Sequence, residues 1–509
     1  MLSQVLSGTV IGIEAFLVFV EVDISSGLPA FSTVGLPEVA VRESKDRVKA
    51  SIRNAGYSFP SDRITVNLAP ADVKKMGTGF DLPIALGILA ASGLIPAASL
   101  AEHMILGELS LDGSIRPAHG VLSLAAAARK AGLRGMFVPA ANAVEAAVVD
   151  GIAVYPVESI PSIVEILAGK AQPIPVQAPG EDFSNKRTYA EDFRDVRGQE
   201  NAKRALEVAA AGGHNILMVG PPGSGKTMLA RRLPGILPEL CFDEALETSM
   251  VYSVCGLLPE GEGLVTARPF RAPHHTVSDA GLVGGGQNPR PGEVSLAHNG
   301  VLFLDEMPEF RRNVLEVLRQ PIESGRVTIS RVNSSVVFPA DFMLVGAMNP
   351  CPCGYLGDRK RSCTCTPEQV NRYRARISGP LLDRVDLHVE VPRVSYRDMR
   401  ANDEGRGSTE IFERVRSARE IQAERFNKAP IQTNAAMGAR LLRRYVSLNL
   451  DGEALLERAV ERFGLSARAH ARILKIARTI ADLEASPDVL ADHVAEAVQY
   501  RSMDRDPFI

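Results

Sequence analysis

The chain has 509 residues, of which 45 % are hydrophobic and 23 % are charged, and its formal net charge is −3. This length predicts about three domains, and the composition is that of a soluble globular protein with sizeable cores. A net charge this close to zero excludes nucleic-acid binding over the whole surface, so any such surface must be a local patch or a ring of loops.

A membrane span is not expected near the amino terminus. Residues 15–20 are apolar, but Glu14 and Glu21 bracket them, and the stretch is too short to cross a bilayer. It is typical of a buried strand rather than of a signal peptide. No other stretch approaches membrane length, so we expect a cytoplasmic protein.

The first block, residues 1–168, alternates strand-like and helix-like runs, which predicts an α/β domain. The strand-like runs are 9–13, 16–22 and 63–68, and the helix-like runs are 82–91, 122–131 and 140–149. Residues 169–189 follow as a linker, because they are rich in Pro and Gln and poor in large apolar residues.

The second block, residues 190–395, alternates buried-strand runs with helices, which predicts a parallel sheet covered on both faces. The last block, residues 396–509, is almost wholly helical beyond its polar stretch 402–408. Within 465–483 one helical face is apolar and another carries a basic stripe of Arg468, Arg472 and Lys475.

A phosphate-binding loop lies between an apolar strand, 216–219, and a helix-forming run that begins at Met228. Its residues are Gly220, Pro221, Pro222, Gly223, Ser224, Gly225, Lys226 and Thr227. The glycines let backbone N–H groups turn towards a triphosphate, Lys226 reaches the outer phosphates, and Thr227 holds Mg²⁺. The pattern and its context predict that the chain binds a nucleoside triphosphate.

Two further strands end in polar side chains. Residues 300–306 form a buried strand that ends in Asp305, placed to hold Mg²⁺, and Glu306, placed to orient or deprotonate the attacking water. The alternative for these acids is a helix cap after a strand. The strand 342–348 leads to Asn349, which could sense the terminal phosphate or position the water.

Phosphoryl transfer also needs cations that stabilise the transition-state charge. Arg384 and Arg468 are candidates, but spacing alone does not select either one, because an Arg on a helix is usually solvated surface.

Taken in order, these elements resemble an AAA+ ATPase, and residues 268–276 and 289–300 resemble its magnesium-chelatase branch. With the first block included, the whole chain resembles the ComM/YifB group of bacterial Mg-chelatase-like AAA+ proteins. The resemblance implies ATP and Mg²⁺ as cofactors, a homo-hexameric ring and a carboxyl-terminal helical lid. The roles that it implies are Walker A for 220–227, Walker B for Asp305 and Glu306, sensor 1 for Asn349, an arginine finger in trans for Arg384 and sensor 2 for Arg468. Arg374 and Arg376 lie near Arg384 and leave the finger assignment less secure than the phosphate loop.

Residues 71–81 and 107–117 of the first block resemble the Lon protease domain. That family uses a Ser–Lys dyad, but here Gly79 stands at the Ser position and Leu122 at the Lys position. Ser123 lies next to Leu122 without an obvious basic partner, and a nucleophile without its base cannot run acyl transfer at useful rates. We therefore expect a catalytically inactive Lon-like domain that assembles the ring or contacts DNA.

Two elements are candidates for contact with nucleic acid. The segment between Lys226 and Asp305 is longer than one helix and one strand require, and it resembles the insertion that this AAA+ branch points into the ring channel. Residues 325–338 read as a hairpin, since two β-rich arms flank a polar tip. Arg331 at the tip and Arg326 are candidate phosphate contacts, and exposed arginines on a solvent hairpin are the alternative.

Four of the six cysteines fall together in the order C-x-C, nine residues, C-x-C: Cys351, Cys353, Cys363 and Cys365. Four thiolates suit a structural Zn²⁺, although the spacing departs from the usual C-x₂-C, and free buried thiols or a redox-sensitive loop are the alternatives. Adjacent histidines in a strand point to opposite faces and chelate poorly, so a structural or loop role is expected for the pair His274–His275.

The resemblance implies an ATP-driven hexameric DNA motor that promotes branch migration of recombination intermediates during natural transformation. Its partners would then be branched, single-stranded and double-stranded DNA, with no membrane. The alternative is the AAA+ motor subunit of a metal chelatase or of a protein-remodelling complex. A protease is discounted on the chemistry of the first block.

Overall fold

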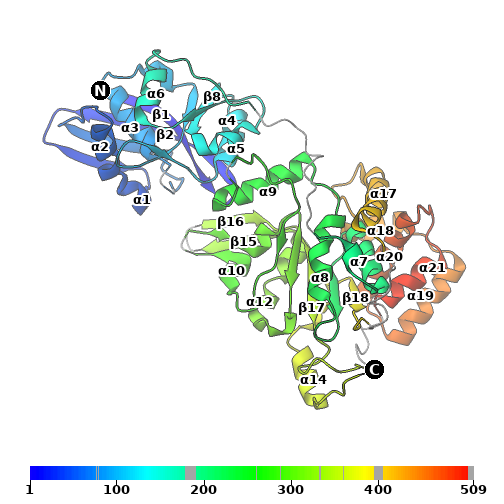
Figure 1. The fold of residues 1–509 in the computed structure, drawn as a ribbon. Helices are drawn as coiled ribbons and strands as arrows, with labels where there is room; N and C mark the ends of the chain where they lie inside the picture. Colours follow the sequence, from blue (N-terminus) through cyan, green and yellow to red (C-terminus); the bar gives the residue numbers. More distant parts are fainter. Residues whose placement is uncertain are drawn as a thin grey trace. The chain divides into compact units, whose positions relative to one another are not determined.

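The structure is a computed structural model. It describes residues 1–501 except positions 76, 78, 178–190, 260, 287, 332–333, 359 and 395–404. The chain forms two compact units (Figure 1). Unit 1 consists of Met1–Phe183, Phe242–Val265 and Ser330–Phe338, and unit 2 consists of Ser184–Cys241, Thr266–Ile329 and Pro339–Ile509.

Unit 1 is built on a mixed seven-stranded sheet with the order β3-β4-β2-β1-β5-β8-β9. Its strands are β1 Leu2–Ile11, β2 Glu14–Ser25, β3 Ala30–Val34, β4 Arg63–Ala69, β5 His103–Ile105, β8 Gly135–Pro139 and β9 Ala153–Val157, and β6 Glu108–Leu109 and β7 Ile115–Arg116 form a separate pair. The first strand begins at Leu2, earlier than the predicted 9–13, and pairs with β2 along its whole length. The predicted start missed this because Val5 to Thr9 are all buried, which hides the two-residue period of a strand.

Helices cover this sheet and complete an α/β unit. They are α1 Val39–Arg42, α2 Ser44–Asn54, α3 Asp81–Ala91, α4 Val121–Lys130, α5 Ala143–Ala147, α6 Ile160–Leu167 and α9 Phe242–Cys255, with 3₁₀ turns at Ala97–Leu100 and Ala140–Asn142. The predicted helices at 82–91 and 122–131 are confirmed to within a residue. The predicted helix 140–149 is too long, since only five of its residues form α5.

Unit 2 contains a five-stranded parallel sheet with the order β11-β14-β17-β10-β18. The strands are β11 Phe270–Arg271, β14 Val301–Leu304, β17 Met343–Met348, β10 Ile216–Val219 and β18 Leu387–Glu390. All residues of β10, β14 and β17 are buried, so the predicted parallel sheet with both faces covered is confirmed.

The remaining elements of this part of unit 2 are short. Its helices are α7 Glu200–Gly212, α8 Lys226–Arg232, α10 Asp279–Val283, α11 Glu293–Leu296, α12 Arg312–Glu316, α13 Arg319–Ser324, α14 Pro367–Arg374 and α15 Gly379–Leu382. The 3₁₀ turns are Phe193–Asp195, Leu233–Ile236 and Met307–Glu309. One small two-stranded sheet is formed by β12 Gly284–Gly285 with β13 Arg290–Pro291. A second is formed by β15 Arg326–Arg331 with β16 Ser334–Pro339, and most of β16 belongs to the Ser330–Phe338 segment of unit 1.

The carboxyl-terminal part of the described chain is helical, as predicted. It contains α17 Ser408–Phe426, α18 Ala439–Tyr445, α19 Leu450–Phe463, α20 Ala467–Leu483 and α21 Ala491–Gln499, with a 3₁₀ turn at Asn434–Ala436. The apolar face of α20 packs into the core that α7 shares with β10. Of the predicted basic stripe only Arg468 is exposed, whereas Arg472 donates to the carbonyl O of Val385 and Lys475 to that of Ala435.

No helix among the described residues combines the length and the apolar character that a bilayer crossing demands. The two sheets, the helices that accompany them and the helical end of the described chain agree with the sequence prediction of a mixed α/β protein with a helical carboxyl terminus.

Candidate nucleotide-binding site

The residues Gly220–Thr227 join β10 to α8 in a loop shaped by glycine. Gly223 and Gly225 have φ angles of +74° and +92°, which favour glycine, and a Cβ at either would meet open space. At Gly220 a Cβ would lie 2.1 Å from the carbonyl O of Val391. The loop thus leaves room for a phosphate group beside the first turn of α8.

Lys226 is the first residue of α8, and only 8 % of it is exposed. Its Nζ donates to the carbonyl O of Gly220 at 2.6 Å, to that of Pro221 at 3.1 Å and to Oδ1 of Asn349 at 3.2 Å. The hydroxyl of Ser224 is buried in the same loop without a hydrogen-bond partner among the described residues. An ammonium group and a free hydroxyl are groups that the oxygens of a phosphate would engage.

The two carboxylates after β14 differ in their contacts and in their exposure to solvent. Asp305 Oδ2 accepts a hydrogen bond from Thr227 Oγ1 at 2.7 Å, whereas Glu306 is exposed and has a φ angle of +50°. A hydroxyl paired with a carboxylate is a hard oxygen donor set that fits Mg²⁺. Burial lowers the pKa of Lys226, and the nearby charges of Asp305 and Glu306 oppose this in part.

The parallel sheet explains why these side chains meet. β10, β14 and β17 are parallel, β17 lies between the other two, and parallel strands end at the same edge of a sheet. The predicted residues Lys226, Thr227, Asp305 and Asn349 are therefore joined by hydrogen bonds, with Glu306 beside them.

The predicted finger, Arg384, lies elsewhere in the chain. It follows α15, only 9 % of it is exposed, and its guanidinium donates to the carbonyl O of Pro380 at 2.5 Å and forms an ion pair with Glu323. The nearby alternative Arg376 pairs with Glu309 at 2.7 Å. These described contacts do not bring Arg384 to the phosphate loop of its own chain.

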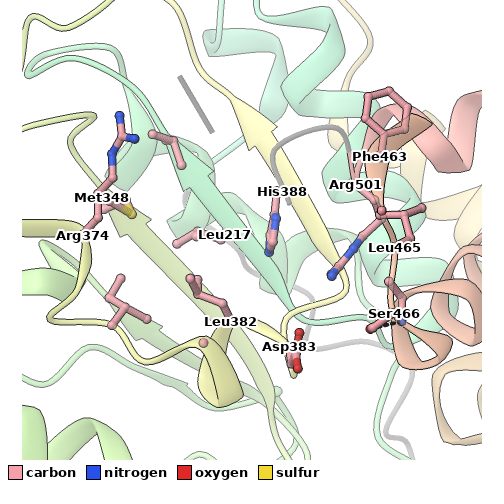
Figure 2. Close-up of a pocket in the computed structure, with 15 residues that line it drawn as sticks. Leu217, Met348, Arg374, Leu382, Asp383, His388, Phe463, Leu465, Ser466 and Arg501 are labelled. Atoms are coloured by element: carbon pink, nitrogen blue, oxygen red, sulfur yellow. Dashed lines mark hydrogen bonds between the residues drawn. The ribbon is translucent and has the colours of Figure 1, made fainter. Parts of the chain in front are cut away.

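A cavity of about 380 Å³ lies beside the nucleotide site rather than in it (Figure 2). Its lining includes Val219 and Met348, the residues just before Gly220 and Asn349, and the loop between α19 and α20. The further lining residues are Leu217, Arg374, Ile377, Gly379, Leu382, Asp383, His388, Phe463, Gly464, Leu465, Ser466, Ala469 and Arg501. None of the predicted catalytic or Mg²⁺-binding side chains lines it, so we assign the phosphate site to the loop and not to this cavity.

Comparison with known proteins agrees with this geometry. The family model described as magnesium chelatase, subunit ChlI, matches residues 192–399, that of subunit ChlI of Mg-chelatase matches 20–142, and that of its carboxyl-terminal part matches 405–501. The competence protein ComM of Haemophilus influenzae is 46 % identical over 99 % of this chain and 98 % of its own length. The chain belongs to the ComM/YifB family of Mg-chelatase-like AAA+ proteins.

Two further relatives differ in how much of the chain they match. YifB of Escherichia coli is 44 % identical over 99 % of this chain and 98 % of its own length. The 38 kDa subunit of magnesium chelatase from Rhodobacter capsulatus is 27 % identical over 62 % of this chain and 88 % of its own length. The family resemblance thus extends over the whole chain, while the chelatase match covers a part of it.

The four cysteines of the predicted metal cluster come together in this ComM/YifB chain. Their sulfur atoms all lie within 4.8 Å of one another, and three of the Sγ–Sγ distances are 3.3, 3.6 and 3.6 Å. Tetrahedral Zn²⁺ with Zn–S bonds of about 2.3 Å places its sulfurs about 3.8 Å apart. The described sulfur positions are therefore close to those of a tetrahedral Zn²⁺ site. The donor set therefore fits Zn²⁺.

The loop that carries these cysteines packs directly on the phosphate loop. Cys351 follows Asn349 by two residues, and a Cβ at Gly354 would lie 2.5 Å from Cδ of Pro222. This contact has no signal in the sequence, because the cysteine motif and the phosphate-loop motif that it joins are far apart in the chain.

The predicted contacts with nucleic acid are only partly described. Residues of the predicted hairpin form β15 and β16, and Arg326 is exposed, but the side chain of Arg331 lies outside the described residues. Within unit 1, a Cβ at Gly12 would lie 2.8 Å from Cγ1 of Val336 in β16. The insertion contributes α9 to unit 1 and α10 to unit 2.

The predicted loop role of the histidine pair agrees with its position in the structure. β11 ends at Arg271, so His274 and His275 are not in a strand, and their ring centroids lie 4.1 Å apart. Among the described residues, the four cysteines are the only close group of three or more His, Cys, Asp or Glu side chains.

At the Lon-like positions of unit 1 the structure shows apolar surroundings. Leu122 is fully buried, and a Cβ at Gly79 would lie 4.0 Å from Cβ of Ala118. Ser123 is buried, and its hydroxyl has no hydrogen-bond partner among the described residues. A serine in this state has no base to activate it.

Proposed function

We propose that this protein hydrolyses ATP with Mg²⁺ at the loop Gly220–Thr227. The observation that carries the proposal is the hydrogen bond between Thr227 and Asp305, at the sheet edge where Lys226 also meets Asn349. Lys226 would hold the outer phosphates, and Thr227 and Asp305 would hold Mg²⁺, which neutralises phosphate charge when bound. Glu306 would orient and deprotonate the attacking water, and Asn349 would sense the terminal phosphate.

The two arginines have proposed roles outside this cluster. Arg384 would act as the finger that stabilises transition-state charge in the neighbouring subunit, and Arg468 as the sensor-2 residue of the lid. A finger in trans requires a closed ring, and we propose a homo-hexamer. In such a ring the Arg384 guanidinium would have to exchange its ion pair with Glu323 for the neighbour's nucleotide.

We further propose that ATP hydrolysis drives movement along branched DNA during natural transformation. The likeness to the Haemophilus influenzae competence protein supports this class of substrate. The exposed Arg326 at the start of the β15–β16 pair supplies a cation for phosphate contact, and Arg331 is proposed for the same role from its place in the sequence.

The direct test is steady-state ATPase activity without DNA, with single-stranded DNA, with duplex and with a four-way junction. We expect the greatest stimulation with the junction, and then ATP-dependent branch migration of that junction. The Lys226→Ala variant supplies the baseline. Equal turnover in all four conditions, with no branch migration, would refute the DNA motor.

The second candidate function is a motor subunit of a chelatase or of another protein-remodelling complex. The match to the magnesium-chelatase subunit of Rhodobacter capsulatus favours it, but this match covers only 62 % of the chain. An ATPase rate that DNA leaves unchanged, but that rises with a co-purifying porphyrin-binding protein, would support this candidate instead.

We also propose that Cys351, Cys353, Cys363 and Cys365 hold one structural Zn²⁺. Elemental analysis of the purified protein should give about one zinc per chain, since four thiolates complete a closed tetrahedral site. The quadruple Cys→Ser variant should contain none. Full-length protein that retains no zinc after purification in zinc-supplemented, reducing buffer would contradict the proposal.

A further inference from the structure

The side-chain amide of Asn215 joins the predicted finger segment to the start of β10, the strand that leads to the phosphate loop. Asn215, the residue before β10, donates from Nδ2 to the carbonyl O of Arg384 at 3.2 Å. Its Oδ1 accepts the backbone N–H of Leu344 in β17 at 2.7 Å. Its backbone N–H donates to Oδ2 of Asp386 at 3.2 Å, and its carbonyl accepts the N–H groups of Asp386 and Leu387 at 2.9 and 3.0 Å.

Groups beside Asn215 hold the same segment from other directions. His214 is fully buried, with Nδ1 at 3.5 Å from Oδ2 of Asp386. Arg472 of α20 and Arg501 both donate to the carbonyl O of Val385, at 3.0 and 2.6 Å. The main chain from the carbonyl of Arg384 to Leu387 is thus fixed to the start of β10, to β17 and to the carboxyl-terminal part of the chain.

The side chain of Arg384 has contacts of its own. The guanidinium donates to the carbonyl O of Pro380 at 2.5 Å and pairs with Glu323, which is itself exposed on α13. Asp383, the residue before it, borders the cavity of Figure 2, where Leu382 and Asp383 face Leu465 and Ser466. The direction in which the guanidinium leaves the main chain therefore depends on the hydrogen bonds around Asn215 as well as on these two side-chain contacts.

We propose that Asn215 is a positioning residue for Arg384. Its amide links the carbonyl of Arg384 to β17, and its main chain leads into β10, so the finger segment is tied to the two strands that precede Gly220 and Asn349. This inference rests on the proposed role of Arg384 in trans. It goes beyond that role because it makes the reach of the finger depend on a residue that contacts no nucleotide.

Two variants separate the contacts of this amide. Asn215→Ala removes both side-chain hydrogen bonds. Asn215→Asp keeps an oxygen acceptor for the N–H of Leu344 but places an oxygen against the carbonyl O of Arg384. We expect both variants to lower kcat about 10- to 100-fold with little change in the KM for ATP, because a misplaced transition-state contact lowers turnover rather than binding.

The decisive readout comes from mixed rings, in which Glu306→Gln subunits supply intact fingers but hydrolyse no ATP. If Asn215 acts through a finger in trans, its variants should regain turnover in such rings, as Arg384→Ala should. Asn142→Ala is the matched control, since Asn142 is a buried amide of unit 1 that hydrogen-bonds Ala118 and Glu145. This control should lower the melting temperature without a rescuable loss of kcat.

The outcomes distinguish the positioning role of Asn215 from the role of Arg384 as a finger in trans. Rescue of Arg384→Ala without rescue of either Asn215 variant would overturn the positioning role and leave the finger intact. Failure to rescue Arg384→Ala would overturn the finger in trans, and the positioning role with it. If Asn215→Ala fails to fold, Asn215→Asp, which keeps the contact with β17, decides the question.

Discussion

Lys226 and Asn349 lie 123 positions apart in the sequence, yet their side-chain polar atoms are 3.2 Å apart. Their meeting was predictable, because each follows a buried strand and parallel strands deliver their ends to one edge. Asn215 was not predictable in the same way. It precedes a strand, and a polar residue at that position has no motif that would mark it among other loop residues.

At the scale of single residues, the Glu306→Gln variant should still bind ATP but lose ATP hydrolysis. The substitution preserves size and removes only the carboxylate that would deprotonate water, so we expect turnover to fall at least about 100-fold. Single-turnover hydrolysis and a nucleotide-binding titration measure the two effects. Glu309→Gln, which removes another exposed carboxylate three residues away, is the control and should leave turnover near the wild-type value.

Lys226→Ala should weaken ATP binding about 10- to 100-fold, because it removes a charge-assisted contact to phosphate.

The same lysine predicts a pH effect on the wild-type protein. Burial lowers its pKa from the ordinary 10.5. Only the ammonium form would make a charge-assisted contact with phosphate. ATP affinity should therefore be full below this lowered pKa and fall as pH rises through it. An affinity that stays constant up to pH 10.5 would argue against this environment.

At the scale of elements, the cysteine loop and the phosphate loop form one packed structure. Gly354 and Gly357 both have left-handed φ angles, +83° and +77°, but only Gly354 lies against Pro222. The sequence motif predicted that the four cysteines would lie together, since their spacing is visible in the chain. It did not predict the contact, which depends on how two loops fold against each other.

This pair of glycines provides a matched test of the contact. Gly354→Ala and Gly357→Ala should each cost about 1–2 kcal/mol in stability through left-handed strain. Only Gly354→Ala should also raise the KM for ATP, since its Cβ would push Pro222 in the phosphate loop. Thermal denaturation and ATPase kinetics of the two variants, measured side by side, give the comparison. An equal KM in both variants would contradict the coupling.

For the whole molecule, the sequence predicted the fold class and the helical carboxyl terminus because periodicity and strand-ending motifs are local signals. The domain boundaries at 168, 190 and 395 remain predictions. Periodicity could not show that Phe242–Val265 and Ser330–Phe338, which interrupt the ATPase block, group with the amino-terminal unit. Such grouping depends on contacts between distant segments.

The proposed DNA motor predicts a specific defect for Arg326→Ala. Because Arg326 is exposed and lies outside the cluster that would bind ATP, basal turnover should persist while stimulation by junction DNA falls. Arg416→Ala, which removes an exposed arginine of α17, is the control and should leave the stimulation unchanged. Equal stimulation of both variants would remove Arg326 from the DNA-binding surface.

The discontinuous make-up of unit 1 has a practical consequence for anyone who dissects this protein. The polypeptide passes back and forth between the two units, so a protease that nicks one linker cannot release either unit as an intact fragment. A truncation that starts after the first block would keep α9 and β16 but strip them of the surface formed by α4 and by the turn at Gly12. No single cut in the chain therefore yields all the segments of one unit without segments of the other.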